Sequence, residues 1–264
     1  MRKIDINSDM GESFGRYKLG LDEEVIRHIT SANVACGFHG GSPGVMRLTT
    51  RLAKEHGVAL GAHPSFPDLV GFGRRPMGVT LEEARDDIVY QVGALMGFAK
   101  AEGVELQHVK AHGAIYNLAH GTGSVSGVDA DELARAMAEA VYDMDDRLIL
   151  VMMAGSRALE IAKETGIRVA GEAFADRAYT PEGGLASRRL EGAVITDPQV
   201  VAARVIRMAT ESRVTAMDGT EVDLGRVDTI CVHGDTPTAV QLVKAIRADI
   251  EAAGISVAPM GAFL

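Results

Sequence analysis

The chain has 264 residues, of which 47% are hydrophobic and 24% charged, so it is long enough to bury the core of one globular domain. Its formal net charge of -9 disfavours a nucleic-acid partner, because such a field repels phosphate backbones. Two cysteines are too few for a disulfide scaffold, and no apolar run approaches the roughly 20 residues that span a bilayer.

The N-terminus is polar from Arg2 onward and lacks the apolar stretch of a signal peptide, which predicts a cytoplasmic protein. Short apolar runs then alternate with helical segments to the end of the chain. The expected strands are residues 4–9, 33–37, 59–63, 108–112, 148–153, 168–174 and 229–233. Such alternation builds a parallel sheet with crossover helices, and seven units favour a closed or nearly closed barrel over an open doubly wound sheet.

Helix starts are marked by an N-cap residue before a proline, at Ser42-Pro43, Asp197-Pro198 and Thr236-Pro237. Thr80 and Glu83 form a capping box that opens a helix ending near Glu102.

Two segments interrupt the alternation. Residues 214–224 are typical of a β-hairpin with Asp218-Gly219 at its turn. Residues 176–196 show no clear periodicity, and loops of that length usually function or are disordered. Gly183-Gly184 suit a hinge and Arg188-Arg189 could close over an anion, so we expect a substrate-covering loop. The alternative is a surface loop whose arginines face solvent.

Polar side chains stand at the carboxyl ends of nearly all expected strands, where parallel α/β folds bind ligands. They are Asn7, Asp9 and Glu12, then His39, His63, Lys110 and His112, and finally Glu172, Asp176, Arg177, His233 and Asp235. We expect them to share one cavity.

A single histidine is more often a satisfied core or surface residue than a ligand or base. We interpret His28, His56, His108 and His120 in that way. The shared position at strand ends favours a functional role for His39, His63, His112 and His233. Cys36 and Cys231 are expected to be small buried hydrophobic residues.

Several known signatures are absent: the Gly-x4-Gly-Lys phosphate loop, the dinucleotide-binding Gly-x-Gly-x-x-Gly after the first strand, His-Glu-x-x-His, Cys-x-x-Cys and Gly-x-Ser-x-Gly. The missing ligand spacings predict no tightly held structural zinc. The residues alone therefore indicate a hydrolase-like site rich in histidines and carboxylates.

Six blocks resemble the LamB/YcsF family. They are residues 5–15 (DINSDMGESFG), 31–39 (SANVACGFH), 61–75, 109–117 (VKAHGAIYN), 172–179 (EAFADRAY) and 231–237 (CVHGDTP). The blocks follow the family order over nearly the whole chain. The family often has Cys at the position of Ser8, so that position cannot supply an essential thiol here.

The resemblance implies a distorted (β/α)7 barrel akin to glycoside hydrolases and deacetylases, formed by residues 1–264 as one domain. It implies ATP-dependent opening of 5-oxoproline (pyroglutamate) to L-glutamate, with ADP and phosphate as products, performed together with the B and C subunits of 5-oxoprolinase. ATP, optionally with Mg²⁺, is the expected cofactor, and no tightly bound cofactor is expected.

If the chain has the activity that the resemblance implies, we expect one set of residues to catalyse the reaction and another to bind the substrate. The catalytic set is Asp9, Glu12, His39, His63, His112, Glu172, Asp176, His233 and Asp235. The substrate-binding set is Asn7, Arg74, Lys110, Asn117 and Arg177. A metal-dependent amide or carbohydrate deacetylase and a non-catalytic subunit that positions substrate remain as alternatives.

Overall fold

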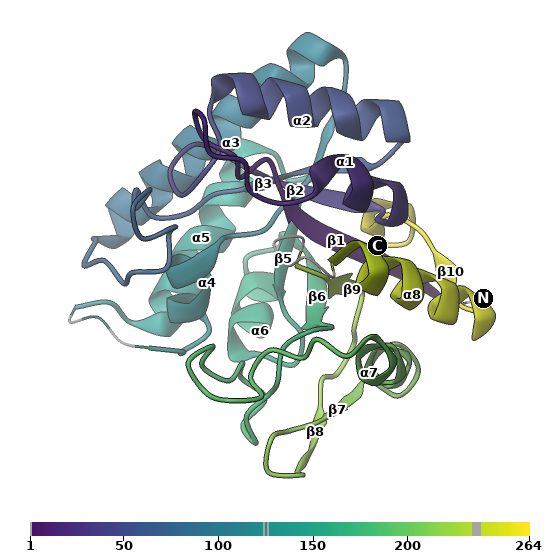
Figure 1. The fold of residues 1–264 in the computed structure, drawn as a ribbon. Helices are drawn as coiled ribbons and strands as arrows, with labels where there is room; N and C mark the ends of the chain where they lie inside the picture. The colour runs from purple at the N-terminus through teal and green to yellow at the C-terminus, as the bar shows by residue number, and fades with distance from the viewer. Residues whose placement is uncertain (1, 124, 126, 234–238) are drawn as a thin grey trace.

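The computed structural model describes residues 2–123, 125, 127–233 and 239–264, and its centre is a closed barrel of parallel strands (Figure 1). The barrel strands are β1 (Lys3–Met10), β2 (Ser31–Ala35), β3 (Ala59–His63), β4 (Leu106–Val109), β5 (Ile149–Met153), β6 (Arg168–Phe174) and β9 (Thr229–Cys231). They pair in that order, and β1 closes the ring by pairing with β9 from Asp5↔Thr229 to Asn7↔Cys231. The seven-stranded barrel that the sequence predicts is confirmed, and the open sheet is excluded.

Helices surround the barrel and cover its outer face (Figure 1). The longer ones are α2 (Pro43–His56), α3 (Leu81–Glu102), α5 (Ala130–Met144), α6 (Arg157–Glu164), α7 (Pro198–Glu211) and α8 (Ala239–Ala252). The shorter elements outside the barrel are α1 (Asp22–Val25), η1 (Ile26–His28), α4 (Gly113–Ala119), β10 (Ser256–Val257) and η2 (Met260–Ala262). None of the helices in the described part of the chain is long and apolar enough to cross a membrane.

The predicted helix starts are confirmed where the structure describes them. The Ser42 hydroxyl accepts from the backbone N–H of Val45, and the Asp197 carboxylate accepts from two backbone N–H groups at the start of α7. Thr80 and Glu83 make both hydrogen bonds of the capping box. These caps satisfy backbone donors that a helix N-terminus leaves free. The Thr236-Pro237 start lies outside the described residues.

The two faces of β1 explain the polarity of the barrel interior. Ile4, Ile6 and Met10 pack in the hydrophobic core between barrel and helices. Asp5 and Asn7 alternate with them and are fully buried among polar partners from other strands. Because successive side chains of a strand point to opposite faces, one strand supplies both the apolar shell and the polar interior.

The fourth strand differs from the prediction of residues 108–112. β4 ends at Val109, and Lys110 and His112 continue as extended backbone whose N–H groups donate to Ala62 and Pro64. His112 is the N-cap of α4, which begins at Gly113. Lys110 and His112 still emerge at the barrel mouth, but beyond the strand rather than within it.

The hairpin predicted at residues 214–224 is confirmed. β7 (Arg213–Thr215) and β8 (Glu221–Asp223) pair antiparallel, and Gly219 lies in the turn with φ +91°. The hairpin lies away from the barrel, beyond α7 (Figure 1).

Candidate active site

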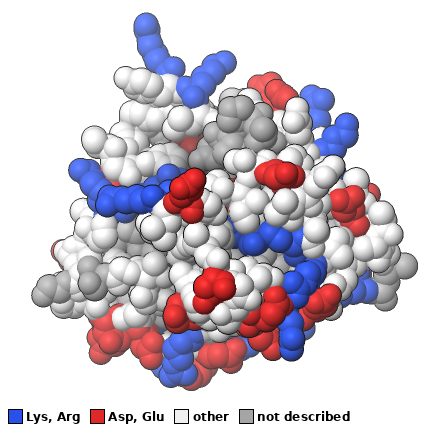
Figure 2. Space-filling view, turned by 60° about the horizontal axis from the view of Figure 1, so that its bottom comes forward, with Lys and Arg blue, Asp and Glu red and all other residues white. Residues whose placement is uncertain are grey.

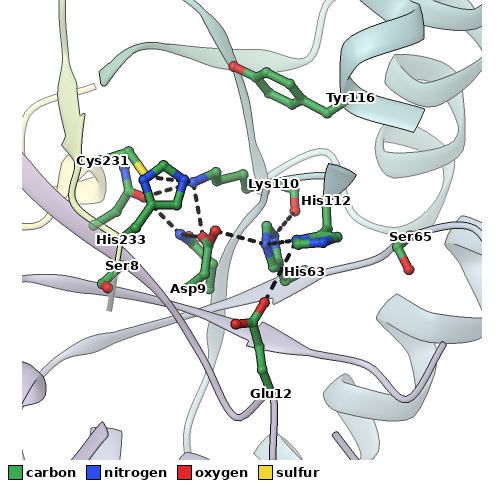
Figure 3. Close-up of polar contacts among 12 residues, drawn as sticks. Ser8, Asp9, Glu12, His63, Ser65, Lys110, His112, Tyr116, Cys231 and His233 are labelled. Atoms are coloured by element: carbon green, nitrogen blue, oxygen red, sulfur yellow. Dashed lines mark hydrogen bonds and ion pairs between the residues drawn. The ribbon is translucent and has the colours of Figure 1, made fainter. Parts of the chain in front are cut away.

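A pocket of about 480 Å³ lies at the carboxyl ends of the barrel strands. Nine residues of the predicted site line it: Asp9, Glu12, His63, Arg74, Lys110, His112, Asn117, Arg177 and His233. The close-up in Figure 3 shows how the side chains from β1, β3 and the segment after β4 point toward one another. The strand-end rule therefore placed most of these residues correctly.

Lys110 is the centre of a buried charge network. Its ammonium nitrogen lies 3.0 Å from Asp9 Oδ1 and 2.8 Å from Glu172 Oε1. It also donates to Asn7 Oδ1 at 3.2 Å and lies 3.1 Å from the sulfur of Cys231. Burial opposes the charge on Lys110, but Asp9, Cys231 and Glu172 outweigh it and hold its pKa well above the ordinary value.

The two acidic partners of Lys110, Asp9 and Glu172, are also held by contacts with neighbouring side chains. Burial opposes ionisation of Asp9, but His63 and Lys110 outweigh it and keep the pKa of Asp9 well below its usual range. Glu172 accepts from Asn7 at 3.1 Å and from the Tyr116 hydroxyl at 3.1 Å. Burial and the neighbouring Glu172 raise the pKa of Tyr116, which therefore stays a neutral donor.

Three histidines and a glutamate form a second group beside this network. His39 Nε2 lies 3.2 Å from Glu12 Oε1, and His112 Nδ1 lies 3.8 Å from the same oxygen and 3.0 Å from His63 Nε2. The rings of His39 and His112 stack with centroids 3.8 Å apart. Burial lowers the pKa of both His39 and His112, so both rings are held neutral.

His233 and Asp176 form a carboxylate–histidine pair at the pocket wall. His233 Nδ1 lies 2.8 Å and 2.9 Å from the two oxygens of Asp176. Burial raises the pKa of Asp176, but the attraction of His233 and the hydrogen bond to it outweigh burial and hold that pKa below its ordinary value. An ionised Asp176 fixes the proton on Nδ1 and leaves Nε2 able to exchange a proton with a ligand.

The segment of residues 176–196 covers one side of the pocket. Leu185, Ala186, Ser187, Arg188 and Arg189 all line it. The segment is tied to itself by backbone hydrogen bonds from Ala178 to Ala193 and from Ala186 to Ala178, so it is a folded wall of the site.

Arg177 anchors this wall from within. Its guanidinium donates to the carbonyls of Ala186 at 2.5 Å and Ala193 at 3.4 Å. Burial and the nearby Arg188 lower its pKa to about 10. Arg177 was predicted to bind substrate; it does line the pocket, but part of its donor capacity holds the loop.

Four predicted residues lie behind the pocket wall instead of lining it: Asn7, His39, Glu172 and Asp176. Asn7 differs most from the prediction that it binds substrate. Its amide donates to Glu172 and Thr229 and accepts from Asn33 and Lys110, so no hydrogen-bonding capacity faces the pocket. Asp235, predicted to be catalytic, lies outside the described residues.

The remaining histidines agree with their interpretation as satisfied residues where the structure shows their contacts. His108 is fully buried with Nε2 2.8 Å from Asn33 Oδ1, and burial lowers its pKa to about 3. His120 accepts from the backbone N–H of Met153 at 3.0 Å, and its other ring nitrogen lies 2.7 Å from the Tyr116 carbonyl.

Sequence reasoning missed three contributors to the site. Tyr116 reaches Glu172 from α4, Ser65 contacts His39, and Cys231 contacts Lys110. Cys231 is buried in the hydrophobic core as predicted, yet its sulfur also lies 3.1 Å from the Lys110 ammonium. Its signal was the two-residue spacing from Thr229, which puts both side chains on the inner face of β9.

One face of the molecule carries charged side chains of both signs (Figure 2). Lysine, arginine, aspartate and glutamate side chains are interspersed over the face that Figure 2 shows. Four arginines line the pocket itself and would attract an anion there: Arg74, Arg177, Arg188 and Arg189.

Comparison with known proteins agrees with the resemblance. The sequence model of the LamB/YcsF family matches residues 4–264. The A subunit of 5-oxoprolinase from Thermococcus onnurineus (strain NA1) is 58% identical over 262 residues, which are 99% of each chain. The protein of the same name from Campylobacter jejuni subsp. jejuni serotype O:6 is 50% identical over 264 residues, covering both chains completely.

A solved structure gives the same result in three dimensions. The lactam utilization protein from Thermus thermophilus superposes with a TM-score of 0.88 at 49% sequence identity, covering 97% of this chain and 99% of that one. The chain belongs to the LamB/YcsF family and is a close homologue of proteins named as the A subunit of 5-oxoprolinase.

Proposed function

We propose that this chain is the A subunit of an ATP-hydrolysing 5-oxoprolinase and acts in the cytoplasm with the B and C subunits, the whole chain serving as one catalytic domain. Full-length identity of 50–58% to proteins of that name is the observation that carries the proposal. The pocket supports it, since carboxylates, histidines and arginines surround a space larger than one five-membered lactam.

The chemistry explains why ATP is needed. A five-membered lactam is a stable amide, and opening its ring at neutral pH is close to thermoneutral or uphill. Transfer of the γ-phosphoryl group of ATP to the amide oxygen makes the carbonyl carbon electrophilic. Water then adds to that carbon, the ring C–N bond breaks and the nitrogen takes up a proton, which leaves γ-glutamyl phosphate and the ADP from the first step. A second water hydrolyses this acyl phosphate to L-glutamate and phosphate.

The residues of the pocket suit the steps that follow activation. In our proposal His233, oriented by Asp176, accepts the proton of the attacking water. Arg74, Arg188 and Arg189 hold the carboxylate and the phosphorylated oxygen by charge-assisted hydrogen bonds. Lys110 pairs with two carboxylates, so we assign it to keeping Asp9 ionised and to holding Asp9 and Glu172 in place.

The sequence contains no Gly-x4-Gly-Lys loop, the motif that binds the phosphates of ATP in many proteins. We therefore propose that the ATP phosphates meet the pocket arginines while the B or C subunit supplies the rest of the nucleotide site. Mg²⁺ would accompany the phosphates and be bound mainly by their oxygens.

Reconstitution tests the function. ATP-dependent release of glutamate from 5-oxoproline is measured with the isolated chain, with the B and C subunits alone, and with all three. We expect turnover only from the complete set. Robust turnover by the B and C subunits alone would refute the proposal, and acetate release from an N-acetylated sugar by the isolated chain would support a deacetylase instead.

A second experiment separates a catalytic from a positioning subunit. His233→Gln should lower turnover of the complete set by about 100-fold or more, the scale of a lost general base. His56→Gln, an exposed histidine at the end of α2, is the control and should match the wild type. Unchanged turnover of His233→Gln in an assembled complex would contradict the catalytic role.

A further inference from the structure

We propose that Glu12, His39, His63 and His112 form a binding site for one divalent transition-metal ion of the zinc type. One donor atom from each of these residues lies within 4.8 Å of all the others, and all four residues are buried. Their four segments of chain meet only in the folded barrel, and Figure 3 shows His63 and His112 side by side with the Glu12 carboxylate pointing toward them.

The hydrogen bonds of His63 and His112 fix which nitrogen carries the proton. His63 Nδ1 lies 2.6 Å from the carbonyl oxygen of Lys110, and His112 Nε2 lies 2.9 Å from the carbonyl oxygen of Phe72. A carbonyl can only accept, so both of these nitrogens donate. The other nitrogens, His63 Nε2 and His112 Nδ1, then face each other at 3.0 Å, and His63 Nε2 also lies 3.3 Å from Asp9 Oδ2.

The hydrogen bonds of His39 likewise fix which of its ring nitrogens carries the proton. Its Nδ1 lies 3.0 Å from Ser65 Oγ, and the Ser65 hydroxyl donates to the carbonyl of Phe66 at 2.8 Å. Ser65 therefore accepts from His39, and His39 Nε2 directs its lone pair at the Glu12 carboxylate 3.2 Å away. Metal-bound histidines characteristically donate their outer N–H to such an acceptor.

Facing lone pairs repel unless a positive centre lies between them. A single proton can join two of the four atoms, whereas one dication serves all four. The spacings of 3.0, 3.2 and 3.8 Å bracket the about 3.3 Å that separates ligands of a tetrahedral ion bonded at about 2.0–2.1 Å.

The donor set selects the class of metal. Three imidazole nitrogens and one carboxylate oxygen suit Zn²⁺, Co²⁺, Ni²⁺ or Fe²⁺, whereas Mg²⁺ and Ca²⁺ require oxygen ligands. This ion is therefore distinct from the Mg²⁺ that would accompany ATP. The four ligands come from separate strand ends, which is why no short ligand motif appears in the sequence.

The backbone around the histidines is shaped to hold them. Phe72, whose carbonyl receives the His112 proton, has φ 56°, a left-handed conformation that costs energy for a residue with a side chain. Gly73 follows at φ +64°, and a Cβ there would lie 2.8 Å from His39 Cβ and 2.9 Å from His112 Cδ2. Only glycine allows the loop to pack this closely on both histidine side chains.

The ion would be reachable from the pocket. Glu12, His63 and His112 line the pocket, and His39 lies behind them. The ion would then lie next to the pocket space, and the carboxylate of Asp9 lies 3.3 Å from His63 Nε2 beside that position.

The test uses the isolated full-length chain and needs no ATP, substrate or partner. The chain is stripped with a chelator, dialysed against Zn²⁺ or Co²⁺ and assayed by elemental analysis and by titration against a competing chelator. We expect about one ion per chain and the intense visible absorption of four-coordinate Co²⁺ bound by histidine.

Variants then assign the ligands. Glu12→Gln and His63→Gln should each lose more than about 100-fold in Zn²⁺ affinity, and Ser65→Ala, which frees the outer nitrogen of His39, about 10-fold to 100-fold. His120→Gln, a hydrogen-bonded histidine outside the cluster, is the matched control and should bind as the wild type does. Circular dichroism confirms that each variant is folded.

Two results would overturn the proposal: a wild-type chain that takes up no ion at micromolar concentrations, or wild-type affinity in both Glu12→Gln and His63→Gln. If His63→Gln does not fold, Glu12→Gln and the Co²⁺ spectrum of the wild type decide. Since binding is measured without turnover, its failure is distinct from failure of the 5-oxoprolinase activity.

Discussion

Replacing Lys110 with methionine tests how much the folded barrel depends on its buried charge network. The side chain is 4% exposed, and its nitrogen lies within 3.0 Å of Asp9 and 2.8 Å of Glu172. Methionine keeps the apolar stem and removes the charge and all three donors. Two buried carboxylates then lose the cation they share.

The expected loss of unfolding free energy is that of removing one partner from a buried ion pair. Loss of one partner costs about 3–5 kcal/mol, because the remaining charge stays buried and unpaired. In the wild type the pKa of Asp9 lies well below its ordinary value, so its stabilising contribution is present at neutral pH and is lost as pH falls through that low pKa. In Lys110→Met the Asp9 carboxylate takes up a proton more readily, so the loss of unfolding free energy becomes smaller as pH is lowered.

The assay is urea unfolding of the full chain at pH 7.5 and pH 5, followed by circular dichroism. Lys100→Met, at an exposed position of α3, is the control and should change stability by less than about 0.5 kcal/mol. Adding Glu172→Gln to Lys110→Met should restore part of the loss. A deficit of Lys110→Met below about 1 kcal/mol at pH 7.5, or a larger deficit at pH 5, would refute the reasoning.

Three further predictions concern the loop, the dyad and the barrel interior. Replacing Arg188 and Arg189 together with alanine should lower turnover of the assembled complex about 100-fold, and wild-type turnover and KM would leave them as solvated surface charges. Asp176→Asn should lower kcat by about 10²–10⁴ by releasing the orientation of His233, and an unchanged pH–rate profile would argue against the dyad. Burial raises the pKa of Asp5 to about 6, so the folded state takes up a proton between that value and the unfolded pKa and gains stability as pH falls. The unfolding free energy of the wild type relative to Asp5→Asn should therefore rise by roughly 1 kcal/mol from pH 7 to pH 5, and a fall would contradict it.

The sequence by itself determined the order of elements and the end of the barrel that carries the chemistry. Apolar runs and helix caps are local signals, because a strand's alternation and a cap's hydrogen bond involve residues within a few positions of each other. The cap of α2 at Ser42 and the hairpin turn at Gly219 were predictable for that reason. Parallel strands share one carboxyl edge, so placing His63 and His233 at the same mouth required no coordinates.

Only the tertiary structure decided what each of these side chains contacts. Asn7 follows the same strand-end pattern as Asp9. Its amide is nevertheless hydrogen-bonded to Glu172, Thr229 and Lys110, which lie 103 to 222 positions away in the sequence. The four residues of the proposed metal site stand on separate segments, and no local spacing reports that their lone pairs converge. Closure of β1 onto β9 and the packing of loops over the mouth decide the role of each polar side chain. It either makes hydrogen bonds within the barrel or remains available to bind a ligand. Those are long-range contacts whose geometry is set by burial of the whole core, which no local pattern encodes.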